Sequence, residues 1–360
     1  MCINKFYLSF LTIASIFILL LSACQPLPTD NASHRLESTE DIIVEDLTTS
    51  SPHLNKSDFE KYIPKSTPLV FTFPTPESEP ISLWRPPLYE IPWALSPQDH
   101  FFFSRPIQAD EINWPSADYR YGGIFFGPDV VHTGIDIPSK KGTTVVAAAA
   151  GEVISVGYGL YLGGNNPNDP YGLAVTIRHD FGYKGKQLYT VYAHLDRIDV
   201  EVGQWVEVGT PIGIVGTTGF TTGAHLHFEV RIDSNSFFST RNPELWLAPP
   251  QGWGVLVGRV MNKNGSLQTK KDVTVRSKSN NQKWTVITYG KHTVNSDEFL
   301  NENLVLSDLP SGEYELIIDY LEVRYISNIE IHPGAITYFS YRGEDGFDLS
   351  PPPTPVPFNW

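Results

Sequence analysis

Two histidines separated by a single residue, His225 and His227, lie in the stretch of this sequence that is best suited to chemistry. From His225 to Ile232, polar residues alternate with apolar ones, which is the pattern of a half-buried β-strand. Alternate side chains of a strand share a face, so both imidazoles point to one side, with their backbones about 7 Å apart. Two imidazoles placed in this way can converge on one metal ion or on one substrate.

The same strand face continues with Glu229 and Arg231. We expect these two side chains to support the histidines or to line the rim of the site, because a metal-binding histidine usually donates its second ring N–H to a carboxylate or a carbonyl. A role of Glu229 as general base would require the strand to bring its carboxylate to the reacting water.

A second pair of possible ligands, His132 and Asp136, lies upstream in the run VHTGIDIP. On a straight strand the two backbones would be about 13 Å apart, which is too far to share one ion easily. A helix would bring them together, but Gly134 and Pro138 disfavour a helix here. A bend at Gly134 is therefore the conformation that brings both side chains to one point.

His132, Asp136 and one histidine of the His-x-His pair would supply two nitrogens and one carboxylate oxygen. This donor set matches tetrahedral zinc with its fourth position left to water, and zinc lowers the pKa of that water and polarises a substrate carbonyl. The other histidine of the pair and His194, in the run VYAHL, remain for proton transfer and for stabilising an oxyanion. Taken singly, each residue is explained as well or better as a hydrogen-bonded structural group, as His179 is, and only the combination indicates a metal site.

Several motifs of this region resemble those of the lysostaphin-type zinc metallopeptidases, which cut peptides of the bacterial cell wall. The resemblance runs from about Gly122 to about Ile232, and the motifs stand in the family's order. They are His132-x3-Asp136, Tyr192-Ala193-His194-Leu195, Gly223-Ala224-His225-Leu226-His227, and the glycines Gly203, Gly209, Gly213, Gly216 and Gly219. The combination is specific, whereas any one motif alone would be weak.

This resemblance implies that His132, Asp136 and His227 bind Zn²⁺ and that His194 and His225 are the catalytic histidines beside the bound water. Some members of the family have lost ligands and act only as activators or scaffolds. No ligand position is missing in this sequence, so the activator role loses its usual support.

The polar segment 158–171, YGLYLGGNNPNDPY, departs from the family pattern in the manner of an insertion. We expect this loop to shape or narrow the region that holds the substrate. The bond that is cut therefore does not follow from the resemblance.

The composition predicts an all-β protein. Gly and Pro number 28 and 29, charged residues make up only 18%, and no long segment past the N-terminus shows the 3.6-residue period of a helix. The resemblance implies an antiparallel peptidase sheet of lysostaphin type, and a smaller β-sandwich follows it. The predicted domains are a signal peptide (1–23), a disordered Ser/Thr/Pro-rich tether (24–80), the zinc metallopeptidase domain (81–250, core 120–235), the sandwich (251–345) and a Pro-rich tail (346–360).

The sandwich prediction rests on short alternating runs between residues 253 and 343, which are separated by Asn-, Gly- or Pro-marked turns. These runs resemble the carboxypeptidase-regulatory or transthyretin-like sandwich, for which a spacer or binding role is expected. In front of the peptidase core, the aromatic segment 83–103 is expected to pack along the domain surface. The run NPELWL at 242–247 is expected to form one helical turn.

The N-terminal sequence predicts a targeting signal rather than a folded segment. Lys5 precedes the apolar run Phe6–Leu21, and the small residues Ser22 and Ala23 precede Cys24, which resembles a bacterial lipoprotein signal. By this resemblance Cys24 would be lipidated, become the new N-terminus and anchor the protein in a membrane of the cell envelope. The apolar run is short for a transmembrane helix, which needs about 20 residues.

The formal net charge of −14 argues against nucleic-acid binding, because that function needs a basic surface. The two cysteines, Cys2 and Cys24, both lie near the N-terminus, so neither a disulfide framework nor a cysteine-based zinc site is expected in the folded part. The sequence does not set the oligomeric state.

The sequence therefore predicts a lipid-anchored, extracytoplasmic zinc endopeptidase that hydrolyses peptide bonds of peptidoglycan, with wall peptides and the membrane as its partners. Two alternatives stay open. One is a wall-binding scaffold or amidase activator that does not hydrolyse, and the other is a peptidase that acts on a secreted peptide. The intact set of five metal-binding and catalytic residues favours an enzyme.

Overall fold

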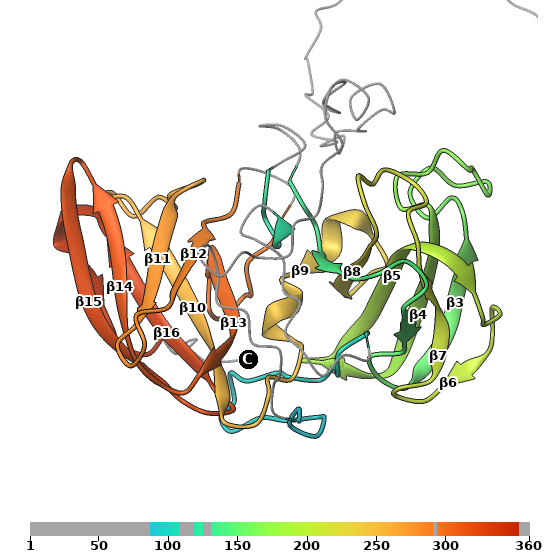
Figure 1. The fold of residues 1–360 in the computed structure, drawn as a ribbon, viewed down its shortest axis with the longest axis horizontal. Coiled ribbons are helices and arrows are strands. Elements are labelled where there is room, and N and C mark those ends of the chain that lie inside the picture. The colour runs from blue at the N-terminus through green and yellow to red at the C-terminus, as the bar shows by residue number, and fades with distance from the viewer. Residues whose placement is uncertain (1–86, 108–118, 125–130, 291–293, 353–360) are drawn as a thin grey trace, which may run out of the picture. The chain divides into compact units, whose positions relative to one another are not determined.

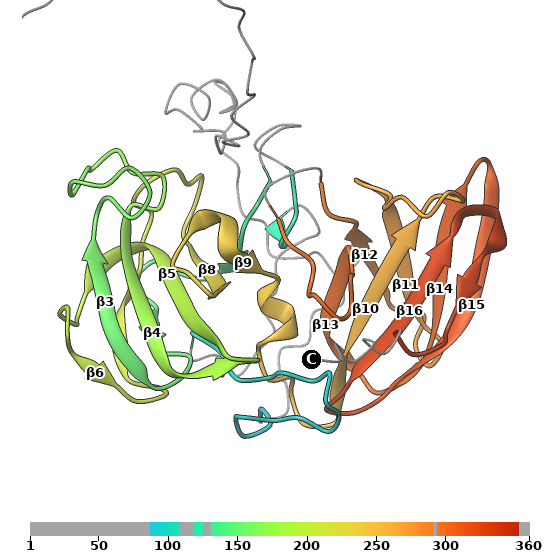
Figure 2. The same cartoon turned by 180° about the vertical axis from the view of Figure 1, so that it is seen from behind.

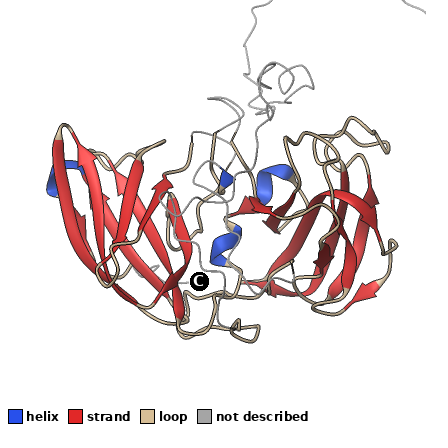
Figure 3. Cartoon of the chain, in the orientation of Figure 1, coloured by secondary structure: helices blue, strands red, loops and turns tan. Residues whose placement is uncertain are grey.

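The computed structural model of the chain describes residues 87–107, 119–124, 131–290 and 294–352 (Figure 1). Their regular structure consists of β-strands and 3-10 helices (Figure 3). The predicted all-β fold is confirmed. The predicted signal peptide, Cys24 and the tether lie outside the described residues, within which no helix is long and apolar enough to cross a membrane.

The first sheet contains nine strands, and all its strand pairs are antiparallel, as predicted. Its main path runs β1-β8-β5-β4-β3-β6, with β7 beside β5 and β2, and β9 beside β8. Strands β3 to β9 are labelled in Figure 1, and Figure 2 shows the sheet from behind. The bounds are β1 Ile135–Pro138, β2 Thr144–Val146, β3 Gly151–Gly157, β4 Leu173–Tyr183, β5 Lys186–Ile198, β6 Trp205–Val206, β7 Pro211–Val215, β8 His225–Ile232 and β9 Thr240–Arg241.

Strand β8, which lies between β1 and β5, carries the His-x-His pair. Its apolar side chains, Leu226, Phe228 and Val230, are fully buried in the main hydrophobic core. Its polar side chains are buried too, so the prediction of a half-buried strand is wrong. The reason is that Thr133, just before β1, and Tyr171, at the end of the 158–171 loop, cover the polar face and hydrogen-bond to Glu229.

Strand β2 is short and stops at Val146, before the buried residues Ala147 and Ala148. The backbone of Ala148 makes other bonds: its N–H donates to the Tyr192 hydroxyl at 2.8 Å, and its carbonyl oxygen accepts from Ser104 N at 2.8 Å. These partners satisfy the polar groups that a strand would have paired.

The C-terminal strands form two four-stranded sheets, β13-β10-β16-β17 and β12-β11-β14-β15. Leu256 and Phe339 from the first of them share one core with Val275 and Leu316 from the second, which is the predicted sandwich packing. Strands β10 and β16 pair in parallel, which the sequence did not indicate. The bounds are β10 Trp253–Met261, β11 Asp272–Ser277, β12 Lys283–Ile287, β13 Leu304–Pro310, β14 Gly312–Tyr320, β15 Val323–Ile331, β16 Ile336–Arg342 and β17 Phe347–Asp348. The last of these strands lies in the segment predicted as a tail.

Short 3-10 helices lie between the strands, among them η2 Phe237–Ser239, η3 Pro243–Leu245 and η4 Gly343–Asp345. Helix η3 is the single turn predicted for NPELWL. It starts where the Asn242 side chain accepts a hydrogen bond from Glu244 N, and Pro243 supplies a preset backbone angle for its first residue.

The main core of the first sheet continues past the predicted domain boundary at residue 250. It includes Val255, Tyr289 and Val305 from the C-terminal part, and Phe101 and Phe103 from the segment that precedes the sheet. Both phenylalanines are fully buried, so the expected surface packing of this segment is wrong for them. Burial of each such aromatic side chain stabilises the folded state by roughly 1.5–3 kcal/mol.

We predict that Tyr192→Phe destabilises the fold by about 1–3 kcal/mol, because it leaves the buried Ala148 N–H without its acceptor. Urea unfolding followed by fluorescence measures this change. Tyr189→Phe, at a partly exposed position on the other face of β5, is the matched control and should unfold like the wild type. Equal midpoints for Tyr192→Phe and the wild type would contradict the prediction.

Candidate metal centre

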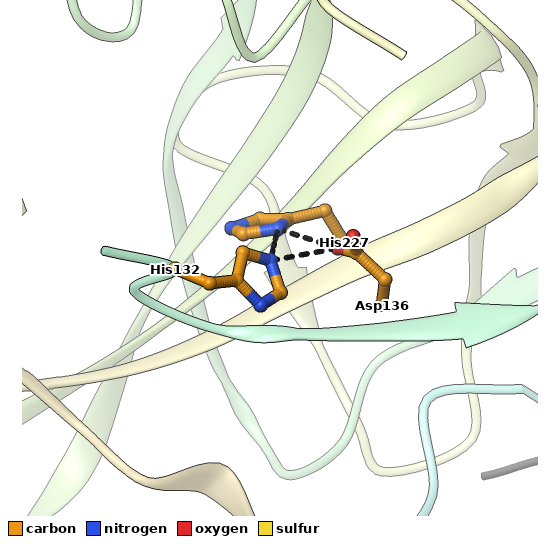
Figure 4. A group of neighbouring side chains, drawn as sticks. All are labelled: His132, Asp136 and His227. Atoms are coloured by element: carbon orange, nitrogen blue, oxygen red, sulfur yellow. Dashed lines mark hydrogen bonds and ion pairs between the residues drawn. The ribbon is translucent and has the colours of Figure 1, made fainter. Parts of the chain in front are cut away.

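Asp136 and His227 meet because β1 pairs with β8. The register sets Asp136 opposite His227 and Pro138 opposite His225, and directly opposed residues of an antiparallel pair project to the same face. The Asp136 Oδ1 and His227 Nδ1 atoms are 2.9 Å apart (Figure 4).

His132 reaches the same point through a bend before β1. The backbone turns at Gly134, where a Cβ atom would lie 2.4 Å from the Phe228 carbonyl oxygen and 2.9 Å from the His227 ring. Any side chain there would push β1 away from β8 or displace His227, so the bend requires glycine. The bend brings His132 Nε2 to 2.9 Å from Asp136 Oδ1 and to 3.0 Å from His227 Nδ1.

These three ligand atoms fit a divalent metal ion. They form a nearly equilateral triangle with edges of 2.9, 2.9 and 3.0 Å, whereas ligands about 2.1 Å from a tetrahedral zinc ion lie about 3.4 Å from one another. A small spreading of the side chains therefore suits the ion. Two imidazole nitrogens and one carboxylate oxygen are also the donors that zinc accepts, and three protein ligands leave one position for water.

A positive charge at this triangle is electrostatically favoured. Burial raises the pKa of Asp136, but the charges of His132 and His225 and hydrogen bonds from His132 and His227 outweigh it, so its pKa lies well below the usual value. Burial lowers the pKa of His227, whereas hydrogen bonds to Asp136 and Glu229 raise it to about 9. The group therefore favours either a proton or a metal ion that replaces the proton.

Each metal-facing histidine is fixed through its other ring nitrogen. His132 Nδ1 lies 3.1 Å from the Arg120 carbonyl oxygen, which can only accept a hydrogen bond. His227 Nε2 lies 3.1 Å from Glu229 Oε1. With a metal ion in place of the extra proton, the remaining protons would sit on the outward nitrogens, and the lone pairs of His132 Nε2 and His227 Nδ1 would be available to the ion.

Glu229 supports His227 and cannot act as a general base in this geometry. Its Oε1 accepts hydrogen bonds from the hydroxyls of Thr133 and Tyr171, each at 2.7 Å, and its Oε2 accepts from Arg231 Nε at 2.7 Å. Burial raises the pKa of Glu229, but Arg231 and His227 outweigh it and hold the pKa at about 2. The carboxylate is thus fully buried and engaged, which agrees with the predicted supporting role.

His194 and His225 lie beside the triangle. Their ring centroids are 4.7 Å apart, and the His194 ring lies 5.7 Å from that of His227. His194 Nδ1 lies 2.8 Å from the Thr218 carbonyl oxygen, and His225 Nδ1 lies 2.9 Å from that of Gly223. Burial lowers the pKa of both rings. In its neutral form each ring carries its proton on Nδ1, which faces the carbonyl oxygen, and a lone pair on Nε2.

The backbone of His194 is strained. Its φ angle is +62°, in the left-handed region that residues other than glycine rarely adopt. The preceding residue, Ala193, pairs with His227 and faces the site, so plain alternation would turn His194 toward the core. The positive φ instead turns its ring toward His225 and His227. Strain of about 1–3 kcal/mol is typical of functional positions.

Two further sequence expectations concern this region. His179 has a structural environment: Nδ1 lies 2.9 Å from the Ala150 carbonyl oxygen, Nε2 lies 2.9 Å from Thr190 Oγ1, and burial lowers its pKa to about 4. The 158–171 loop is ordered by the buried Asp169, which accepts hydrogen bonds from backbone N–H groups of the loop. Through its last residue, Tyr171, the loop contacts the His227 ring, with centroids 5.6 Å apart.

Sequence reasoning missed the groups that orient the histidines. The carbonyl oxygens of Arg120, Thr218 and Gly223 orient the rings of His132, His194 and His225. The sequence could not indicate them, because every residue type has a main-chain carbonyl. Thr133 and Tyr171 were missed as partners of Glu229, although Thr133 lies next to His132 in the sequence. A hydroxyl beside a predicted ligand was the one available signal.

Comparison with known proteins places these residues in a family. Residues 130–238 match Peptidase family M23. Lysostaphin from Staphylococcus staphylolyticus is 33% identical over 153 residues, which are 42% of this chain and 29% of that protein. Glycyl-glycine endopeptidase ALE-1 from Staphylococcus capitis is 31% identical over 175 residues, covering 48% and 44%. DD-carboxypeptidase/endopeptidase Mpg from Neisseria meningitidis is 43% identical over 103 residues, covering 29% and 20%.

The chain spans less than half the length of each of these relatives, so the likeness concerns one domain. The matched range contains all five residues predicted as metal-binding or catalytic, from His132 to His227. Residues 130–238 therefore form a domain of peptidase family M23.

Proposed function

We propose that the protein is a zinc-dependent endopeptidase that hydrolyses peptide bonds of bacterial peptidoglycan outside the cytoplasm. The observation that carries this proposal is the convergence of His132, Asp136 and His227 beside His194 and His225 within a family M23 domain. Three protein ligands support a catalytic metal, because structural zinc sites use four.

The proposed zinc ion would be held by His132 Nε2, Asp136 Oδ1 and His227 Nδ1. When bound, zinc supplies a water of lowered pKa and polarises the substrate carbonyl. The chain keeps the ligands rigid, because the outward nitrogens of both histidines are tied to Arg120 and Glu229.

His194 and His225 supply the proton chemistry in this proposal. Hydrolysis forms a C–O bond to the substrate carbonyl carbon and breaks its C–N bond, and one proton must move from water to the departing amine. Each ring holds its proton on Nδ1 against a carbonyl oxygen, so Nε2 can accept the proton of the water. Once protonated, the same nitrogen donates to the oxyanion or to the amine.

The class of substrate rests on the resemblance to wall-cutting peptidases, and the bond that is cut stays open. One relative is a glycyl-glycine endopeptidase and another is a DD-carboxypeptidase/endopeptidase, so the names of the relatives describe different specificities. The 158–171 loop, which reaches the site through Tyr171, is the segment of this chain expected to set its own preference.

The proposed location follows from the N-terminal sequence, with lipid attached at Cys24 as the anchor. We predict that cells expressing the full chain incorporate labelled palmitate into the protein and that Cys24→Ala abolishes the labelling. Cys2→Ala is the control and should label normally, because Cys2 would be removed with the signal. Labelling of Cys24→Ala would contradict the anchor.

We predict about one zinc ion per chain in purified protein that lacks residues 1–24, measured by mass spectrometry of the metal content. His227→Ala should lose the ion, because it removes one of three ligands. His225→Ala should retain it, because the Nδ1 atom of this ring is held by the Gly223 carbonyl and the ring supplies no ligand atom to the triangle. Similar metal contents in the two variants would contradict this division of roles.

We predict that His194→Ala and His225→Ala each reduce hydrolysis of purified cell walls by about 10²–10⁴-fold with the metal retained, because each removes a proton-transfer group. New amino termini in the released fragments, identified by mass spectrometry on walls of known cross-bridge chemistry, measure the activity and show the bond. Lys263→Ala, at an exposed position in the sandwich, is the control.

The alternative role as a scaffold or amidase activator makes a different prediction. Zinc-loaded wild-type protein would then bind walls from several species and release no new termini. That result would contradict the proposed enzyme.

A further inference from the structure

A short turn, residues 119–124, makes three hydrogen bonds with His132, and we call it the Arg120 turn. The Arg120 carbonyl oxygen lies 3.1 Å from His132 Nδ1. Gly122 N donates to the His132 carbonyl oxygen at 2.8 Å, and His132 N donates to the Gly123 carbonyl oxygen at 2.7 Å. Both the backbone position and the ring orientation of this ligand therefore depend on the Arg120 turn.

Tyr289, Gly290 and Asn295, which lie between β12 and β13 of the C-terminal sandwich, contact the Arg120 turn. Gly290 N donates to the Gly122 carbonyl oxygen at 2.9 Å, and Asn295 N donates to the Tyr121 hydroxyl at 2.9 Å. Gly122, at φ +81°, packs on the Tyr289 ring so closely that a Cβ atom would lie 2.5 Å from its Cδ1. The contact leaves no room for the turn to shift toward the sandwich.

A buried ion pair adds a second connection between the turn and the sandwich. Arg120 Nη1 donates to Glu244 Oε1 at 2.6 Å, and the two side chains are 5% and 0% exposed. The same oxygen accepts from Ser307 N at 3.1 Å and from Ser307 Oγ at 2.9 Å in β13. Charged groups this deeply buried tolerate few arrangements, since a displaced partner leaves a costly unpaired charge.

We propose that the C-terminal sandwich is a positioning element of the metal centre, which holds His132 in place through the Arg120 turn. This inference rests on the proposed metal site and adds a role for the sandwich beyond that of a spacer or binding module. Partners that orient a metal-binding histidine are typically worth 10–100-fold in metal affinity. A disturbance at the contact between the sandwich and the Arg120 turn should therefore weaken zinc binding without touching a ligand.

Gly290→Ala tests this inference in the chain from Gln25 onward. The added methyl would lie 2.5 Å from Ile124 Cγ2 and 3.2 Å from Val131 Cγ2. It would therefore press on the Arg120 turn, through Ile124, and on the residue that precedes His132. We expect zinc affinity, measured by competition with a chromogenic chelator well below the melting temperature, to fall about tenfold.

Gly258→Ala is the matched control, because its methyl would lie 2.5 Å from Phe339 Cζ inside the sandwich core, away from the Arg120 turn. Both glycine variants should melt at lower temperature, and only Gly290→Ala should bind zinc more weakly. Equal zinc affinity of Gly290→Ala and the wild type would overturn the inference, because a purely structural contact lowers the melting temperature alone.

Glu244→Gln gives a second measurement that does not depend on the folding of Gly290→Ala. It keeps the size of the side chain and removes the charge that Arg120 needs, so zinc affinity should again fall. Glu298→Gln is its control, since Glu298 is exposed and pairs with Lys186 at the surface. Unchanged affinity in Glu244→Gln would contradict the inference, whereas a wild-type protein that binds no zinc would overturn the proposed function and this inference with it.

Discussion

The antiparallel pairing of β1 with β8 is the constraint on which the candidate metal centre depends. It sets Asp136 opposite His227, and a shift of one residue would turn every side chain of β8 to the other face. Strand β5 fixes the opposite edge of β8, with Ala193 beside His227. From there the positive φ of His194 carries one more imidazole to the same face. Strand register, the bend at Gly134 and a single strained residue therefore assemble four histidines and one aspartate.

Local patterns in the sequence predicted most strands of the fold, because alternation and turn residues act over a few positions. The strands of the sandwich and β8 follow directly from such runs. The parallel pair β10–β16 and the burial of Phe101 could not be predicted in this way, since both depend on partners that are distant in the sequence. The same holds for Ala148, whose N–H is paired by the hydroxyl of Tyr192 rather than by a strand.

The residues of the candidate site were predicted by their combination, and their arrangement was predicted only in part. The bend at Gly134 followed from the spacing of His132 and Asp136, because no regular element brings that spacing together. Alternation placed His225 and His227 on one face but could not distinguish them, and the division of roles came from the family resemblance. In the structure they differ by their acceptors, a main-chain carbonyl for His225 and the Glu229 carboxylate for His227.

The shared hydrophobic core has a consequence for the order in which the chain can fold. Phe101 and Val305 belong to one core, and Trp93 Nε1 donates to the Gly334 carbonyl oxygen across 241 residues of sequence. Contacts between such distant residues form late and slowly, because the long loop between them must first close. A chain that emerges with its N-terminus first therefore lacks these partners of Trp93 and Phe101 until its last third is available. The contacts of Gly290 and Asn295 with the Arg120 turn, which holds His132, likewise need that part of the chain.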